Sequence, residues 1–183
     1  MLAHSVQRGG RHPIGYGRGL TPIDYKWKAL WPSLLSTIIG ALIVLSGLLL
    51  FVLEIASLGL LGKIGITPSL YGCAVGIWAG LFIMAAGVLI LMIAYMKSVR
   101  LWALIAFCAT VAATIFAIID FSIVAARVAD LRSVGAFDSI FTDLKSVAGL
   151  NGAQLAFGLV AFLLCLAFIG LYVHIYMKIR KYR

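Results

Sequence analysis

Four long runs of apolar residues dominate this sequence, and they decide what the chain can fold into. We place them at residues 33–61, 70–96, 101–126 and 152–177. Each run exceeds the ~20 residues that cross a hydrocarbon core ~30 Å thick. Because the core of a bilayer holds no water to satisfy peptide groups, a continuous apolar run must be helical there. The sequence therefore predicts an all-α integral membrane protein, a bundle of four transmembrane helices.

The composition of the chain agrees with lipid as its solvent. Of its 183 residues, 63% are hydrophobic and 11% are charged, whereas soluble domains are about half apolar and about a quarter charged. Outside the four runs lie a basic amino-terminal tail, residues 1–32, and a basic carboxyl-terminal tail, residues 178–183. The expected organisation is thus one transmembrane domain, residues 33–177, between two tails.

Lys and Arg residues gather on one side of the expected spans. Five lie in the amino-terminal tail, two in the turn at 97–100 and four in the carboxyl-terminal tail, which leaves four of 15 for the other side. Membrane proteins keep such residues in the cytosol, so we expect cytosolic N- and C-termini. The net charge of +9 then follows from the orientation of the chain in the membrane and from attraction to anionic lipids on the cytosolic side. We therefore expect no nucleic-acid partner.

The larger external segment, residues 128–150, has a pattern of its own. Its apolar residues recur mostly at three-residue spacing, with charged residues between them. This spacing is typical of amphipathic helices. We therefore expect a partly helical second extracellular loop, with one or two short helices interrupted near Gly135, which lies on the outer membrane surface as a lid. A plain ordered loop is the alternative.

Residues that could carry enzymatic chemistry do not form a recognisable pattern. The sequence has no HExxH, GxSxG or phosphate-binding glycine loop. Its three cysteines, Cys73, Cys108 and Cys165, each lie within an apolar run and are expected to be small packing residues. We expect that the chain is not an enzyme and binds no metal and no cofactor.

Three charged residues lie inside or beside the apolar runs: Glu54 in the first, Asp120 in the third and Arg127 just after the third. Counted from the inner ends of their spans, both carboxylates lie ~30 Å along their helices, near the outer edge of the core. Arg127 follows Asp120 by seven residues and so shares its helix face. One interpretation is a pair of acids at an outer cation vestibule. The alternatives are pairing with Arg127 or Lys63, hydration by headgroups, or contact with a partner subunit.

Glycines recur along the first two spans at intervals that place them on common helix faces. In lipid, tight helix association depends on small residues that let backbones approach each other. We expect this face to pack the bundle internally, with the docking of another membrane protein as the alternative. The residues concerned are Gly40, Gly47, Gly72, Gly76, Gly80 and Gly87, together with Trp78.

Parts of these spans resemble a known family. The run GALIVLSG at 40–47 looks like the glycine-spaced pattern of the membrane-spanning four-domains subfamily A proteins. The run IWAGLFI at 77–83 is similar to their Trp-x-Gly element and to the Trp-Ala-Gly of the related sarcospan, and Asp120 matches an acidic residue of some members. The loop cysteines common in that superfamily are absent from this sequence. The resemblance implies an accessory role that organises, traffics or tunes a receptor, channel or adhesion complex.

The functional expectation is therefore a non-enzymatic accessory or structural subunit of a larger membrane complex. It would act through helix packing in the bilayer, with other integral membrane proteins as partners. The alternative is a subunit of an oligomeric ion channel or transporter that uses Glu54 and Asp120. We expect the protein to reside in the plasma membrane. An intracellular or mitochondrial membrane is the alternative location.

Overall fold

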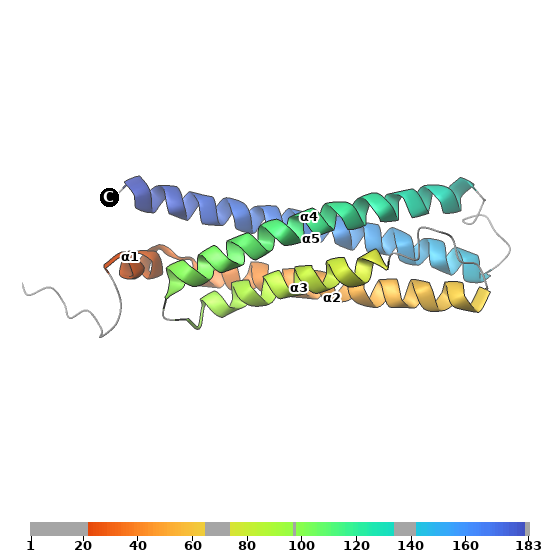
Figure 1. Ribbon diagram of the computed structural model, residues 1–183, viewed down its shortest axis with the longest axis horizontal. Coiled ribbons are helices and arrows are strands. Elements are labelled where there is room, and N and C mark those ends of the chain that lie inside the picture. The colour runs from red at the N-terminus through yellow and green to blue at the C-terminus, as the bar shows by residue number, and fades with distance from the viewer. Residues whose placement is uncertain (1–21, 65–73, 97, 134–141, 182–183) are drawn as a thin grey trace, which may run out of the picture.

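The chain forms a bundle of four long helices with one short helix at one end (Figure 1). The computed structural model describes residues 22–64, 74–96, 98–133 and 142–181. The helices are α1 (Pro22–Leu30), α2 (Ser33–Ile64), α3 (Val75–Ile93), α4 (Val99–Ser133) and α5 (Thr142–Lys181). The four long helices are each long and apolar enough to cross a membrane. The predicted all-α fold with four spans is thus confirmed, and the chain is a multi-pass membrane protein.

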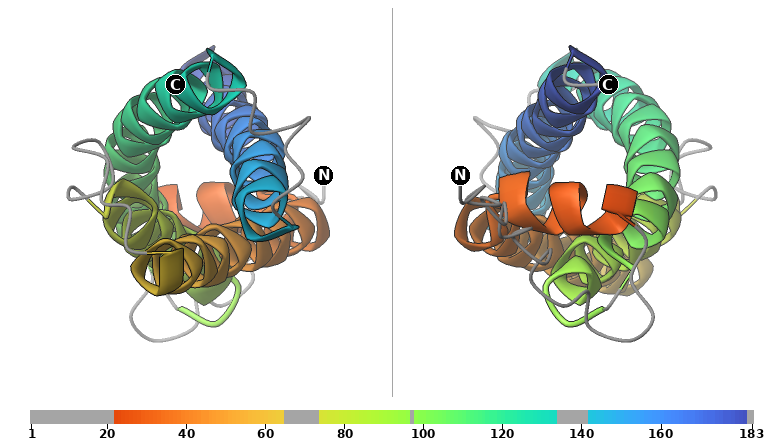
Figure 2. Two further views of the ribbon diagram at one scale, coloured as in Figure 1. Left: turned by 90° about the vertical axis from the view of Figure 1, so that its right-hand side faces the viewer. Right: turned by 90° about the vertical axis from the view of Figure 1, so that its left-hand side faces the viewer.

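The four long helices follow one another around a ring in the order α2, α3, α4, α5, and α5 closes the ring against α2 (Figure 2). Hence α2 and α4 lie on one diagonal, and α3 and α5 on the other. The interior is packed with buried apolar side chains, among them Ile43, Ile83, Ala113 and Phe168. Each long helix also exposes large apolar side chains, because the solvent of its outer face is lipid.

Helices α2 and α3 approach closely where glycines face each other. A Cβ atom on Gly47 would lie 2.8 Å from the carbonyl oxygen of Gly80, and one on Gly80 would lie 2.7 Å from that of Gly47. Gly40 and Gly87 form the same arrangement, with corresponding distances of 3.2 and 2.9 Å. Any side chain at these positions would push the backbones apart. These four glycines therefore lie inside the bundle, between α2 and α3.

Helices α4 and α5 are longer than the spans we expected from the sequence. Helix α4 continues to Ser133 and α5 begins at Thr142. Much of the segment 128–150 is therefore helical as the ends of two long helices, and not as separate helices on the membrane surface. The reason is packing, since Val147 and Ala148 at the start of α5 are buried against Leu61 of α2. The interruption expected near Gly135 lies outside the described residues.

Helix α3 is shorter than expected, with 19 residues. It begins at Val75 because Ala74 adopts a left-handed backbone conformation, with φ 41° and ψ 41°, which cannot continue a right-handed helix. It ends at Ile93, where Ala94 and Tyr95 form a turn. Local backbone geometry thus determines both ends of α3.

The end of the expected amino-terminal tail contains helix α1, which lies across one end of the bundle against α4 and α5 (Figure 2). Trp27 and Trp31 are only 3% and 7% exposed. The Trp27 ring lies 5.8 Å from that of Tyr172, and the Trp31 ring 6.3 Å from that of Phe168. Indoles beside lysines at the start of a span are typical of an interfacial anchor, but these two are buried and cover the end of the apolar interior.

Candidate functional site: a buried polar cluster

Four polar side chains meet inside the bundle, towards the end where α4 leads into α5. They are Glu54 of α2, Asp120 and Arg127 of α4, and Gln154 of α5, and we call them the polar cluster. Each is at most 1% exposed. Because neither lipid nor bulk water reaches them, these groups depend on one another for charge compensation and hydrogen bonds.

An ion pair forms the centre of the polar cluster. The Arg127 Nη1 atom donates hydrogen bonds to Glu54 Oε1 at 3.0 Å and to Glu54 Oε2 at 2.9 Å. Both side chains are 0% exposed. In such surroundings the attraction offsets a large desolvation cost, and removing one partner alone costs about 3–5 kcal/mol. The pair therefore acts as an internal cross-link between α2 and α4.

Gln154 connects the two carboxylates of the polar cluster. Its Nε2 atom donates a hydrogen bond to Glu54 Oε2 at 3.0 Å and a longer one to Asp120 Oδ1 at 3.4 Å. One amide group thus joins α5 to both α2 and α4. Since this amide is neutral, it orients the two carboxylates without changing the net charge of the cluster.

Helix α3 contributes space to the polar cluster through Gly76. A Cβ atom on Gly76 would collide with Gln154 Nε2 and would lie 2.9 Å from Glu54 Cβ. On α5, a Cβ atom on Gly158 would lie 3.4 Å from Asp120 Oδ2. The absence of side chains at these glycines lets the polar groups fit between the backbones. All four long helices therefore take part in the site.

Further polar side chains extend the site by one helical turn towards the α4–α5 connection. Ser57 follows Glu54 by three residues, Asn151 precedes Gln154 by three, and both are 0% exposed. The Asn151 Nδ2 atom donates a hydrogen bond to the carbonyl oxygen of Val147 at 2.8 Å. Within the described part of the chain, Ser57 Oγ, Asp120 Oδ2 and Gln154 Oε1 have no hydrogen-bond partner. The site thus contains buried oxygen atoms that could accept hydrogen bonds but receive none from its own side chains.

Of the residues singled out in the sequence, the structure brings together Glu54, Asp120, Arg127 and Gly76. Trp78 lies apart from them, 59% exposed on the outer face of α3, and Gly72 lies outside the described residues. Both carboxylates are fully buried, and the partner of Glu54 is Arg127. Pairing with Arg127 was one of the alternatives to the open vestibule, although we expected it near the membrane surface and not inside the bundle.

Gln154, the residue that connects the cluster, was not among the predicted site residues. It lies in the fourth apolar run, which contains no charged residue. The available signal was a lone amide in a membrane span. In a bundle of antiparallel neighbouring helices, this amide lies at the same depth as the acids of the first and third spans. Because a buried amide needs partners as much as a charge does, this signal was meaningful.

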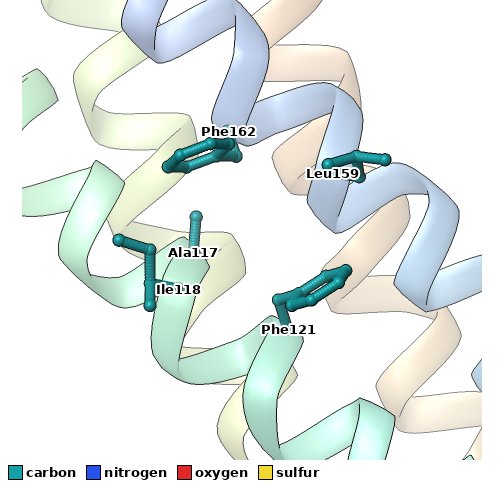
Figure 3. Close-up of a pocket in the computed structure, with 5 residues that line it drawn as sticks. All are labelled: Ala117, Ile118, Phe121, Leu159 and Phe162. Carbon is teal, nitrogen blue, oxygen red and sulfur yellow. The ribbon is translucent and has the colours of Figure 1, made fainter.

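A separate apolar cavity lies between α4 and α5 (Figure 3). Its volume is about 230 Å³, and it is lined by Ala117, Ile118 and Phe121 of α4 and by Leu159 and Phe162 of α5. Ile118 and Leu159 are also exposed on the outer surface. This cavity offers van der Waals contact without hydrogen bonds, which suits a lipid acyl chain.

Over the stretches that the structure describes, no group of three or more His, Cys, Asp or Glu side chains could hold a metal ion.

The fold and the polar cluster define the class of protein, a four-span membrane bundle with a charged core. Comparison with known proteins finds no matching family model, no similar curated protein and no similar solved structure. The resemblance to the membrane-spanning four-domains subfamily A proteins therefore stays a hypothesis that rests on the motifs quoted above.

Proposed function

We propose that the chain is a non-enzymatic accessory subunit of a larger membrane assembly, with integral membrane proteins as its partners. The observation that carries this proposal is the internal closure of the bundle. Glu54 and Arg127 pair with each other at 2.9 Å, and the glycines at the α2–α3 contact are occupied by that contact. A bundle closed in this way is a self-contained scaffold. Partner proteins would then contact its outer, lipid-facing surface.

Part of that outer surface can admit a partner helix at close range. Gly59 and Gly62 on α2, and Gly149 and Gly152 on α5, have nothing within 4 Å of where a Cβ atom would lie. We call these four residues the open glycines. Small residues let helix backbones approach closely in membranes. Since the bundle does not use the open glycines for its own packing, they support a role in contact with another helix.

Purification from native membranes tests this proposal. Gly59→Leu and Gly152→Leu should leave the bundle folded, because both positions are open, and should reduce the recovery of the partner severalfold by mass spectrometry. Gly170→Leu is the matched control, since Gly170 also has open surroundings but lies 18 residues further along α5. Recovery of the same partner in equal amounts from all three variants would contradict the proposed contact. A wild-type chain that purifies alone would contradict the accessory role.

We further propose that the end of the bundle that carries α1 faces the cytosol, in the plasma membrane. Exposed basic side chains of the described residues gather at this end, where both α2 begins and α5 ends (Figure 1). Such residues favour the cytosolic side and attract the anionic lipids of that leaflet. They are Lys26, Lys28, Arg100, Lys178, Arg180 and Lys181.

A channel or transporter subunit is the second candidate function. The observation in its favour is that Gln154 brings Glu54 and Asp120 together inside the bundle. Intramembrane carboxylates of this kind occur on ion pathways. Liposomes that contain the purified protein should then show an ion flux, which Glu54→Gln and Asp120→Asn abolish. Such a flux would favour this function over the accessory role.

A further inference from the structure

The polar cluster contains an odd number of charges. When ionised, Glu54 and Asp120 carry two negative charges, and Arg127 carries one positive charge. Helix α3 contributes no titratable side chain over Val75–Ile93, and α5 faces the cluster with the neutral Gln154. The nearest lysines along α2 and α5, Lys63 and Lys145, are exposed. A fully ionised cluster would therefore hold one negative charge in excess inside a membrane bundle, which is costly.

The two carboxylates differ in how well their charges are stabilised. Both oxygens of Glu54 accept hydrogen bonds from Arg127, and Glu54 Oε2 accepts a third from Gln154, all at 2.9–3.0 Å. Asp120 accepts only the 3.4 Å hydrogen bond from Gln154, and its Oδ2 atom has no hydrogen-bond partner among the described residues. An ionised carboxylate without donors is strongly disfavoured in a buried site.

We propose that the polar cluster is a proton-binding site in which Asp120 holds one proton while Glu54 stays ionised beside Arg127. The proton removes the excess charge without any side chain beyond those already present. It also suits the surroundings of Asp120 Oδ2, which faces the α5 backbone at Gly158 and not a cation. This site is independent of the accessory role.

Proton binding couples the site to the packing of the helices. The folded bundle retains a proton that Asp120 would release to water once the helices separate. Stability should therefore fall as the pH rises from about 4, where an aspartate in water ionises, until the bundle itself loses the proton, because only the folded state retains the proton over this range. Loss of the proton would leave a buried negative charge against α5, which opposes the contact between α4 and α5.

Infrared spectroscopy of the full chain in lipid nanodiscs tests the site directly, through the C=O stretch of a protonated carboxylic acid at neutral pH. The sequence makes the assignment sharp, because Glu54 is the only glutamate among six acidic residues and the other five are aspartates. Labelling aspartate carboxyl groups with ¹³C should shift this band, and labelling glutamate should not. Asp120→Asn should remove the band, whereas Asp130→Asn, an exposed aspartate on the same helix, should retain it.

Three outcomes would overturn the proposal. The first is the absence of a protonated-acid band from the wild-type protein at neutral pH. The second is a band that shifts with labelled glutamate, since the proton would then be on Glu54. The third is loss of the band when sodium replaces choline, which would make the site a sodium site. The labelling experiments use the wild-type chain, so they decide the matter even if Asp120→Asn fails to fold.

Discussion

Arg127 and Glu54 form an ion pair across the diagonal of the bundle, at 2.9 Å, although α2 and α4 are not neighbours in the ring. Contacts between neighbouring helices leave each helix some freedom to rotate about its own axis. A charged contact across the diagonal restricts that freedom for both helices, because each side chain must point to the centre. Gln154 extends the same restriction to α5.

Removal of Arg127 should therefore be among the most damaging single changes. Arg127→Ala leaves Glu54 buried without its cation and should lower the free energy of unfolding by about 3–5 kcal/mol. Denaturant titration of the purified protein in detergent measures this change. Arg132→Ala, at an exposed position in the last turn of the same helix, should change stability by no more than about 0.5 kcal/mol. If both substitutions cost the same, the ion pair does not hold the bundle together.

Gly76 should not tolerate even a methyl group. In Gly76→Ala the Cβ atom would collide with the Gln154 amide and with Glu54 Cβ, and such overpacking costs about 1–3 kcal/mol. Gly59→Ala adds the same atom where the surroundings are open and should stabilise α2 by up to about 1 kcal/mol, through better helix propensity. The two variants should thus shift the midpoint of thermal unfolding in opposite directions. Equal shifts would show that the cluster adapts around residue 76.

Ala74→Gly should stabilise the protein. Ala74 has φ 41°, a left-handed conformation that costs a residue with a Cβ atom about 1–2 kcal/mol, and glycine does not incur this cost. We expect a higher midpoint of thermal unfolding for this variant. Ala94→Gly is the control at the other end of α3, where φ is −64° and glycine should give no gain. A fall in stability with Ala74→Gly would contradict the backbone conformation described here.

Trp27→Ala should release α1 from the end of the bundle. The indole is 3% exposed, and truncating a buried aromatic side chain costs about 3–5 kcal/mol. With α1 undocked, tryptic cleavage at Lys26 and Lys28 should accelerate by about tenfold or more, because cleavage follows the population of the open form. Tyr25→Ala, on the exposed face of α1, should leave the cleavage rate unchanged. Equal acceleration in both variants would show that α1 is already undocked.

The proposed orientation predicts a labelling pattern. In a variant without the native cysteines, Lys28→Cys and Lys181→Cys should react with an impermeant maleimide only after the cytosolic face is opened. Lys63→Cys, at the opposite end of α2, should react in intact cells. Labelling of Lys28→Cys and Lys181→Cys from opposite faces would contradict an even number of spans.

The four spans were predictable because each is a continuous apolar run, and lipid leaves such a run no alternative to a helix. Their ends were not predictable in the same way. The apolar spacing of residues 128–150 indicated helix, which the structure has up to Ser133 and again from Thr142, but this spacing could not show that these turns continue α4 and α5. That continuation depends on a tertiary contact, the burial of Val147 against the end of α2.

The polar cluster was predictable only in part. The spacing between Asp120 and Arg127 placed both on one face of α4, and pairing of the intramembrane acids with Arg127 was one of the alternatives. The choice of Glu54 as partner required the ring order of the helices, which periodicity alone does not give. The burial of Trp27 and Trp31 could not be predicted for a similar reason. Indoles and lysines beside a span are typical of an interfacial anchor, and the same pattern occurs when the segment folds across the end of the bundle.

The short α3 has a consequence for the surrounding bilayer. Its 19 residues rise about 28 Å, whereas the hydrophobic thickness of plasma membranes is about 32–33 Å and that of the endoplasmic reticulum about 27 Å. The contact between Gly47 and Gly80 fixes α3 to α2, so α3 cannot adjust its tilt alone. A bilayer of plasma-membrane thickness must therefore either thin beside α3 or be met there by residues that flank the helix, and each adjustment carries a modest elastic cost.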